Sequence, residues 1–207
     1  MFTNVLTATQ QTVLERLSTL PVVHTFYLAG GTGLALHLGH RRSVDFDFFR
    51  QEQFDPNRLL TELGSLGPGP VHQAQQDTLT VELRGVATSF FAYAQAPVRA
   101  LVPSPWAFKI AAVEDIAAMK LGAIAGRGSR KDFIDLYCIC RQRLLLSEAL
   151  RVFDEKFRGV PYERYHLLKS LTYFDDAEAE PLPDMIASVT WKDVKAFFLR
   201  EAASLFA

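Results

Sequence analysis

The sequence predicts an α/β or α+β fold, in which helices flank a mixed sheet in the first half and a helical region makes up the second. In residues 1–105, apolar runs typical of strands alternate with segments of helical periodicity. From residue 113 onward nearly every segment has helical periodicity. Of the 207 residues, 49% are hydrophobic and 22% charged, which is ordinary for a folded globular protein. We therefore expect a core at 1–105 and a helical region at 106–207 packed on it.

The first elements surround a run of glycines. Apolar residues at helical spacing predict a helix over 8–20, which Pro21 ends. The apolar, aromatic residues 24–29 predict a buried strand, and residues 34–38 predict a second helix. Between them stand Gly30-Gly31-Thr32-Gly33, which predict a tight turn from strand to helix.

A strand with two acidic residues follows. Residues 44–49 alternate strictly, so Asp45 and Asp47 lie on one face of the strand and Phe46 and Phe48 on the other.

The remaining elements follow from periodicity and from proline and glycine breaks. The pattern predicts a helix at 55–66, three strands of a meander at 71–76, 78–84 and 86–93, and a further strand at 108–111. It then predicts helices at 113–125, 130–142, 146–158, 161–174 and 190–206. Residues 175–184 hold five acids and two prolines, so we expect an exposed loop there that is available to a partner.

Composition excludes several classes of function. With 22 basic and 23 acidic residues the net charge is −1, which excludes a strongly basic coat for nucleic acid but not a local basic patch. No leader-like or membrane-spanning segment is evident. Cys138 and Cys140 are two residues apart on a predicted helix and point to different faces, so we expect no disulfide between them. We expect a cytoplasmic protein. Five scattered histidines lack the spacing of a zinc site.

The paired acids and the glycines are the first candidates for chemistry. Carboxylates two apart on a strand repel each other unless a cation lies between them, and Mg²⁺ prefers such oxygen ligands. Amides at a helix start, exposed by Gly30, Gly31 and Thr32, attract phosphate. Taken singly, the acids could be the wet face of an edge strand and the glycines a plain turn.

Together they resemble a known signature. The segment AGGTGLALHLGHRRSVDFDFF, with thirteen residues between Gly31 and Asp45, is similar to that of the polymerase-β-like nucleotidyltransferase superfamily. Residues 109–137, KIAAVEDIAAMKLGAIAGRGSRKDFIDLY, resemble the second block of its AbiEii/AbiGii toxin family.

The resemblance implies a nucleotidyltransferase core and a site. Asp45 and Asp47 would hold Mg²⁺, and Gly30, Gly31 and Thr32 would cradle the phosphates of an NTP. Lys120 would contact the triphosphate, with Asp132 and Asp135 nearby. Positive charge for phosphate or RNA would come from Arg127, Arg130 and Lys131.

The residues of the second block also have plain structural interpretations. Ser129 and Asp132 have the spacing of a capping box, and Lys131 and Asp135 that of an exposed helical ion pair. Lys120 could be a solvated helical lysine. In the loop before the acidic strand, Arg41 and Arg42 could be solvated charges or phosphate contacts.

Many enzymes of the superfamily have a third carboxylate on a neighbouring strand, and Ser89 stands at that position in this sequence. Glu82 is the nearest acid and is expected to face solvent.

The sequence leaves three candidate functions. The first is a Mg²⁺-dependent toxin that transfers a nucleotide from NTP to an RNA, tRNA among them, or to a protein, with an antitoxin as partner. The others are a non-catalytic binding module and a small-molecule (antibiotic) nucleotidyltransferase.

Overall fold

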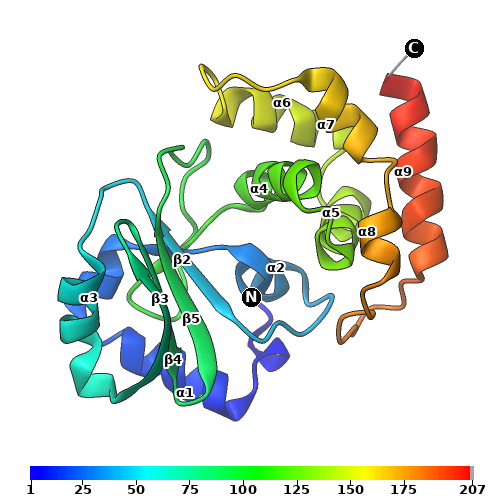
Figure 1. Ribbon diagram of the computed structural model, residues 1–207. Helices are drawn as coiled ribbons and strands as arrows, with labels where there is room; N and C mark the ends of the chain where they lie inside the picture. Colours follow the sequence, from blue (N-terminus) through cyan, green and yellow to red (C-terminus); the bar gives the residue numbers. More distant parts are fainter. Residues whose placement is uncertain (206–207) are drawn as a thin grey trace. The chain divides into compact units, whose positions relative to one another are not determined.

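The computed structural model describes residues 1–205, which form two compact units (Figure 1). The first unit is Met1–Ala112, and the second begins at Val113. The division expected at residue 105 falls inside the first unit, before β6 (Lys109–Ile110). β6 belongs to the first unit because it pairs in parallel with β1 (Tyr27–Leu28). Among the described residues, no helix is long and apolar enough to cross a membrane.

The first unit contains a six-stranded mixed sheet, which confirms the predicted sheet type. Its order is β3-β4-β5-β2-β1-β6. β2 pairs in parallel with β5 and antiparallel with β1. The strands other than β1 and β6 are β2 (Phe46–Arg50), β3 (Pro68–Gln75), β4 (Thr78–Leu83) and β5 (Val86–Ala92).

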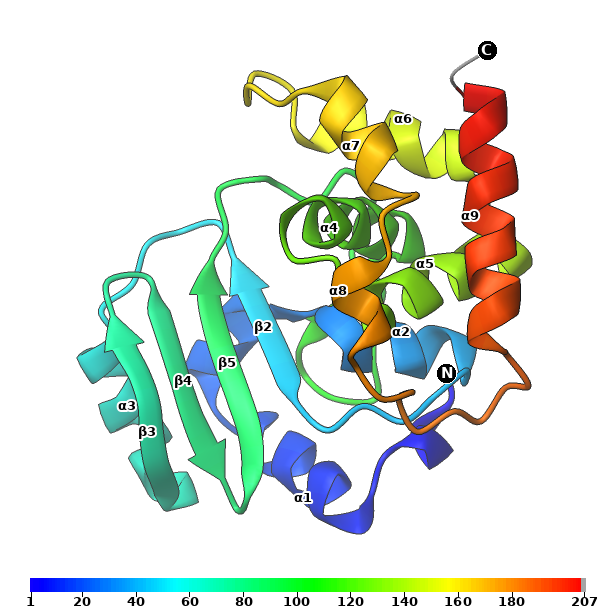
Figure 2. The ribbon, with the colours of Figure 1, turned by 45° about the vertical axis from the view of Figure 1, so that its right-hand side comes forward.

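The sheet has one fully buried apolar face and one partly exposed face, which we call the polar face and which also carries aromatic rings. Phe46 and Phe48 are fully buried on the apolar face, as the alternation predicts. Helices α1 (Ala8–Leu17) and α3 (Pro56–Glu62) contribute to the same core, and Figure 2 shows α3 behind β3. The polar face carries the candidate acids, so the strand pattern decides which side of the sheet holds the site.

Three predictions near the start of the chain are corrected. The strand expected at 24–29 is only Tyr27–Leu28, because Pro21–Thr25 form a 3₁₀ helix with Pro21 in its first turn. The glycines were expected to form a turn before the second helix. They are instead the first residues of that helix, because α2 runs over Gly30–Leu38. The helix expected at 55–66 ends at Glu62 and continues as a 3₁₀ turn over Leu63–Leu66.

The second unit is helical, as predicted. Phe133 lies at its centre and contacts the rings of Phe174, Trp191 and Phe198. The expected helix at 161–174 is shorter, and a short helix stands in the expected loop at 175–184. Residue 206, the last of the expected helix at 190–206, lies outside the described residues. The helices are α4 (Val113–Gly126), α5 (Arg130–Gln142), α6 (Leu146–Lys156), α7 (Arg164–Ser170), α8 (Asp175–Glu178) and α9 (Trp191–Leu205).

Candidate active site

The site in the first unit begins with the first turn of α2. Ala29 precedes the helix and gives it no side-chain cap. The Gly33 amide donates to the Ala29 carbonyl at 2.9 Å, so the amides of Gly30, Gly31 and Thr32 belong to the turn that has no intrahelical acceptors. Such a turn carries partial positive charge and attracts anions.

Two hydrogen bonds join this turn to the strand with the acids. The Ala29 amide donates to the backbone carbonyl of Asp47 at 2.9 Å. The Thr32 hydroxyl donates to the backbone carbonyl of Asp45 at 2.5 Å, and Thr32 is only 1% exposed. Thr32, expected to cradle phosphate, therefore uses its hydroxyl to hold Asp45.

Gly30 lies against the carboxylate of Asp47. Its φ is +62°, and a Cβ placed on it would lie 2.3 Å from Asp47 Oδ2. Only glycine fits, because a side chain would clash with the carboxylate and would strain the backbone. The close approach brings the start of α2 and the acid side by side.

Arg41 and Ser43 complete this group. The sequence left Arg41 open between a solvated charge and a phosphate contact, and it did not single out Ser43. Arg41 is 4% exposed, and a Cβ on Gly31 would lie 2.5 Å from its Nη2 and 2.8 Å from Ser43 Oγ. The solvated interpretation of Arg41 is therefore wrong, whereas Arg42 is exposed. The Ser43 hydroxyl donates to Asp45 Oδ1 at 3.1 Å.

A buried glutamine far away in the sequence holds this loop. Gln10 Nε2 donates to the backbone carbonyl of Ser43 at 2.6 Å, and Gln10 is 4% exposed. No local pattern could have linked Gln10 to the site, because its partner is 33 residues away.

Ser89 occupies the strand position next to Asp47. The two residues are register partners in the parallel β2–β5 pair, and Ser89 Oγ lies 3.0 Å from Thr80 Oγ1 of β4. Glu82 Oε1 accepts a hydrogen bond from His72 Nε2 at 3.0 Å, on an exposed part of the sheet. Within residues 1–205 no three acidic, histidine or cysteine side chains are grouped as metal ligands.

Two carboxylates nevertheless fit Mg²⁺. This ion is usually bound through one or two protein carboxylates, with substrate phosphates and water as its other ligands. Asp47 faces the cradle that a Cβ on Gly30 would fill, so a phosphate held by the start of α2 would lie beside it. The donor set suits a metal that arrives with its nucleotide.

The second unit brings the second block together around Lys120. Lys120 is 6% exposed, and its Nζ lies 2.8 Å from Asp132 Oδ1 and 2.7 Å from Asp135 Oδ2. Arg127 binds Asp132 with two nitrogens, at 2.8 and 3.1 Å. Lys120 is thus not a solvated lysine, and Asp135 pairs with Lys120 rather than with Lys131 as an exposed helical ion pair would.

These contacts set the ionisation of Asp132. Burial by itself would raise the pKa of the fully buried Asp132 carboxyl, but the charge of Lys120 and the hydrogen bonds from Arg127 and Lys120 outweigh it and lower the pKa below its ordinary value. Two carboxylates, one ammonium and one guanidinium balance in charge.

The start of α5 is capped from elsewhere in the chain, so the capping-box interpretation of Asp132 is wrong. The Ser129 side chain makes no cap bond with its own helix. Instead, Glu180 Oε2 accepts hydrogen bonds from Ser129 Oγ at 2.6 Å and from the Arg130 amide at 2.9 Å.

Arg130 is also engaged within the second unit. Its guanidinium donates to the carbonyls of Ala177 and Glu178, both at 2.8 Å, and lies over the ring of Trp191. The acidic segment 175–184 is therefore partly held by α5, and the expectation that it is a wholly exposed loop is corrected.

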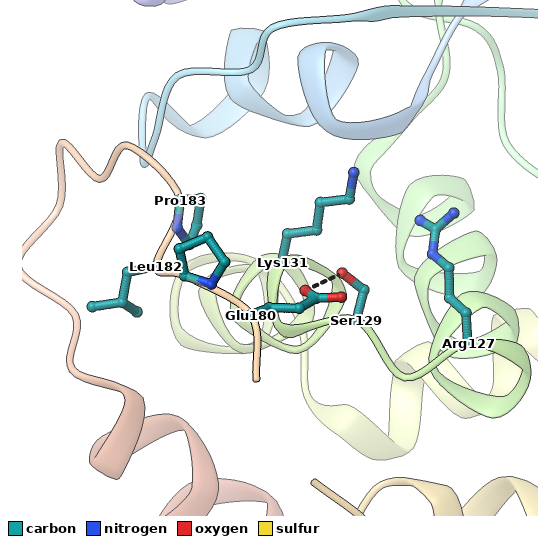
Figure 3. Close-up of a pocket in the computed structure, with 7 residues that line it drawn as sticks. Arg127, Ser129, Lys131, Glu180, Leu182 and Pro183 are labelled. Atoms are coloured by element: carbon teal, nitrogen blue, oxygen red, sulfur yellow. Dashed lines mark hydrogen bonds between the residues drawn. The ribbon is translucent and has the colours of Figure 1, made fainter. Parts of the chain in front are cut away.

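A cavity of about 440 Å³ adjoins this cap, and Arg127 and Lys131 extend toward one side of it (Figure 3). Its lining comprises Arg127, Ser129, Lys131, Glu180, Pro181, Leu182 and Pro183. Another cavity, of about 570 Å³, lies in the first unit around Arg50, Phe26 and Phe54, and its lining includes none of the predicted site residues.

Known proteins match both the sequence and the fold. The chain is 36% identical over 200 residues to an uncharacterized protein of Aquifex aeolicus (strain VF5). The matched region covers 93% of this chain and 93% of that protein. The fold is similar to MenT4, a nucleotidyltransferase toxin of Mycobacterium tuberculosis H37Rv, with TM-score 0.63, 16% identity and coverage of 95% of this chain and 81% of that one. It is also similar to the antibiotic-resistance factor ANT(2'')-Ia, with TM-score 0.53, 18% identity and coverage of 79% and 97%. The family model described as nucleotidyl transferase AbiEii toxin, type IV toxin–antitoxin system, matches residues 12–204, and the chain therefore belongs to the AbiEii family of nucleotidyltransferase toxins.

Proposed function

We propose that this protein is a Mg²⁺-dependent nucleotidyltransferase that transfers a nucleotide from an NTP to an RNA acceptor, with tRNA the first to be tested. It would act in the cytoplasm as a toxin restrained by an antitoxin. The observation that carries the proposal is the contact of Gly30 with Asp47, which joins an uncapped helix start to a carboxylate. Phosphate and metal would meet there.

The proposed reaction is a displacement at the α-phosphorus of the NTP. An acceptor hydroxyl oxygen forms a bond to that phosphorus, the bond to the bridging oxygen of the β-phosphate breaks, and pyrophosphate leaves with that electron pair. The hydroxyl proton passes to solvent, since Ser89 stands where a carboxylate base would be. Positioning and charge neutralisation supply most of the rate in such a reaction.

Each site residue of the first unit has a role in the proposed reaction. Asp45 and Asp47 would hold Mg²⁺, which when bound neutralises phosphate charge. The amides of Gly30, Gly31 and Thr32 would bind phosphate oxygens, with the buried Arg41 guanidinium beside Gly31. Thr32 and Ser43 orient Asp45 through their hydroxyls.

In the second unit, we propose that Lys120 and Asp132 act by fixing Arg127 as a phosphate-binding cation. Asp132 is fully buried and holds the Arg127 guanidinium at two points, yet the Arg127 side chain is 61% exposed. A cation held in this way suits phosphate better than a freely rotating one. Arg130, also expected to bind nucleotide, has a guanidinium engaged with residues 177 and 178, so we assign it to the fold.

Transfer of label from each α-labelled NTP to total tRNA, other RNA and protein, with Mg²⁺, tests the function. We expect transfer by the native chain and none by the Asp45→Asn/Asp47→Asn double variant. A Glu15→Gln/Glu52→Gln variant, which removes two exposed carboxylates, is the matched control and should act like the native chain. Transfer by the double variant, or no transfer to any acceptor, would contradict the proposal.

A second candidate is a nucleotide-binding module without catalysis, which the replacement of a carboxylate by Ser89 favours. Calorimetric binding of an NTP with Mg²⁺, in the absence of transfer to any acceptor, would support it. An aminoglycoside panel with ATP covers the small-molecule alternative, because ANT(2'')-Ia shares the fold.

A further inference from the structure

Three aromatic rings lie in a row across the sheet of the first unit. Tyr27, Phe49 and Phe91 are register partners on β1, β2 and β5. The rings of Tyr27 and Phe49 are stacked, with centroids 6.0 Å apart, and those of Phe49 and Phe91 are stacked at 5.2 Å. These three rings are cross-strand neighbours, and we call Tyr27, Phe49 and Phe91 the aromatic row.

The aromatic row lies on the same face as the candidate acid. Phe49 and Phe91 follow Asp47 and Ser89 by two residues on their strands, and side chains two apart share a face. Two residues of a strand span about 7 Å. Phe49 and Phe91 are partly exposed, whereas Phe48 and Phe90, on the other face, are fully buried in the core.

The row ends at Phe91. Its register partner on β4 is Thr78, whose side chain is too short to cover a phenyl ring. Among the described residues, Phe49 is the aromatic partner of Phe91, so one ring face of Phe91 lacks an aromatic neighbour. Beside Thr78 on this face stands Thr80, bonded to Ser89. On this face, the Phe91 ring therefore stands beside the small hydroxyl side chains of β4.

We propose that the base of the NTP stacks on the Phe91 ring, above Thr78 and Thr80. This inference rests on the proposed function, because the triphosphate must lie at Gly30 and Asp47. A nucleotide whose phosphates lie beside Asp47 has its base within one nucleotide length, and the aromatic row begins about 7 Å away along the strand. Flat bases stack on aromatic side chains whatever their sequence, so all four NTPs bind and purines, with the larger ring system, bind tighter.

Two substitutions test the stacking surface from opposite directions. Phe91→Leu removes the ring and keeps an apolar side chain. Thr78→Phe places a second ring against Phe91, where the base would stack. Aromatic cross-strand pairs favour the sheet, so loss of binding would not reflect unfolding. Trp106→Leu is the matched control, because Trp106 packs against the apolar core and stacks on Phe108.

The measurement is the calorimetric Kd of Mg²⁺–ATP and of Mg²⁺–tripolyphosphate, which has the phosphates but no base. We expect Phe91→Leu and Thr78→Phe each to weaken ATP by about 5- to 150-fold and to leave tripolyphosphate unchanged. Phe91→Trp should retain ATP binding, and Trp106→Leu should leave both ligands unchanged.

Three results would overturn the inference. Equal weakening of both ligands would mean that the substitutions disturb the phosphate site. Unchanged ATP binding would mean that the base of the NTP does not stack on Phe91. A raised KM for the acceptor alone would mean that Phe91 stacks on a base of the acceptor RNA instead. If the native chain bound neither ligand, the proposed function itself would fail, which is a separate outcome.

Discussion

Ser89 stands directly beside Asp47, in register across the parallel pair of β5 and β2. The Ser89 hydroxyl forms a hydrogen bond with the Thr80 hydroxyl. A carboxylate at position 89 would lie on the same face as Asp47, one strand away, at a spacing of about 4.8 Å between strands. Position 89 is therefore where a third acid would stand next to Asp47, and the sequence has a serine there.

Replacing Ser89 by aspartate should make stability depend on Mg²⁺. Without metal, a second carboxylate beside Asp47 should cost up to about 1 kcal/mol, because like charges opposite each other in a sheet repel. With Mg²⁺, the Tm of Ser89→Asp should rise more than that of the native chain. Thermal melting with and without Mg²⁺ checks this, with Ser89→Asn as the neutral control. Equal Mg²⁺ shifts in the two variants would show that position 89 does not face the metal site.

Gly30→Ala should be one of the most damaging small changes in the chain. It places a methyl group 2.3 Å from Asp47 Oδ2 and a side chain at φ +62°, and such strained backbone costs about 1–3 kcal/mol. Urea unfolding should show this loss, together with weaker NTP binding. Gly64→Ala is the control, since a Cβ there meets nothing within 4 Å, and it should stay within about 0.5 kcal/mol of native. Similar losses at both positions would argue against the close approach.

Lys120→Met should destabilise the second unit by about 3–5 kcal/mol, because it leaves Asp132 and Asp135 buried without their shared cation. A Lys120→Met/Asp135→Leu double variant should recover much of this loss, since Asp132 keeps Arg127. Urea unfolding measures both variants. Arg58→Met, which breaks an exposed pair with Glu62, should cost under about 1 kcal/mol. A small effect of Lys120→Met would mean that the cluster is open to water.

The lowered pKa of Asp132 predicts a loss of stability in acid. Its folded-state pKa lies below the value of about 3.9 for an unfolded aspartate. The stabilisation is therefore present above the unfolded pKa and is lost as pH falls through the folded pKa. Urea unfolding between pH about 5 and about 2 should show a decline that is shallower in Asp132→Asn. Glu15→Gln, at an exposed position, should keep the native slope. Parallel declines in all three proteins would contradict the assignment to Asp132.

Local patterns predicted the parts of the site that depend on neighbours in sequence. The alternation of residues 44–49 placed Asp45 and Asp47 on one face because side-chain direction in a strand repeats every two residues. The glycines before a helical segment predicted an exposed helix start, although α2 begins at Gly30 itself. The length of the strand before them was overestimated, because Pro21 and the residues after it form a 3₁₀ helix instead.

The sequence by itself predicted the alternating acids, the exposed amides at a helix start, most helices of the second half and the family. Only the tertiary structure decided what the charged side chains do. It buries Arg41 beside Gly31, joins Gln10 to Ser43, and gives Lys120 two carboxylates that lie 12 and 15 positions further along the chain. A lysine on a helix looks the same in sequence whether it is solvated or buried. Its state depends on which other helix packs against it, because a buried charge is tolerated only where opposite charges meet it in space.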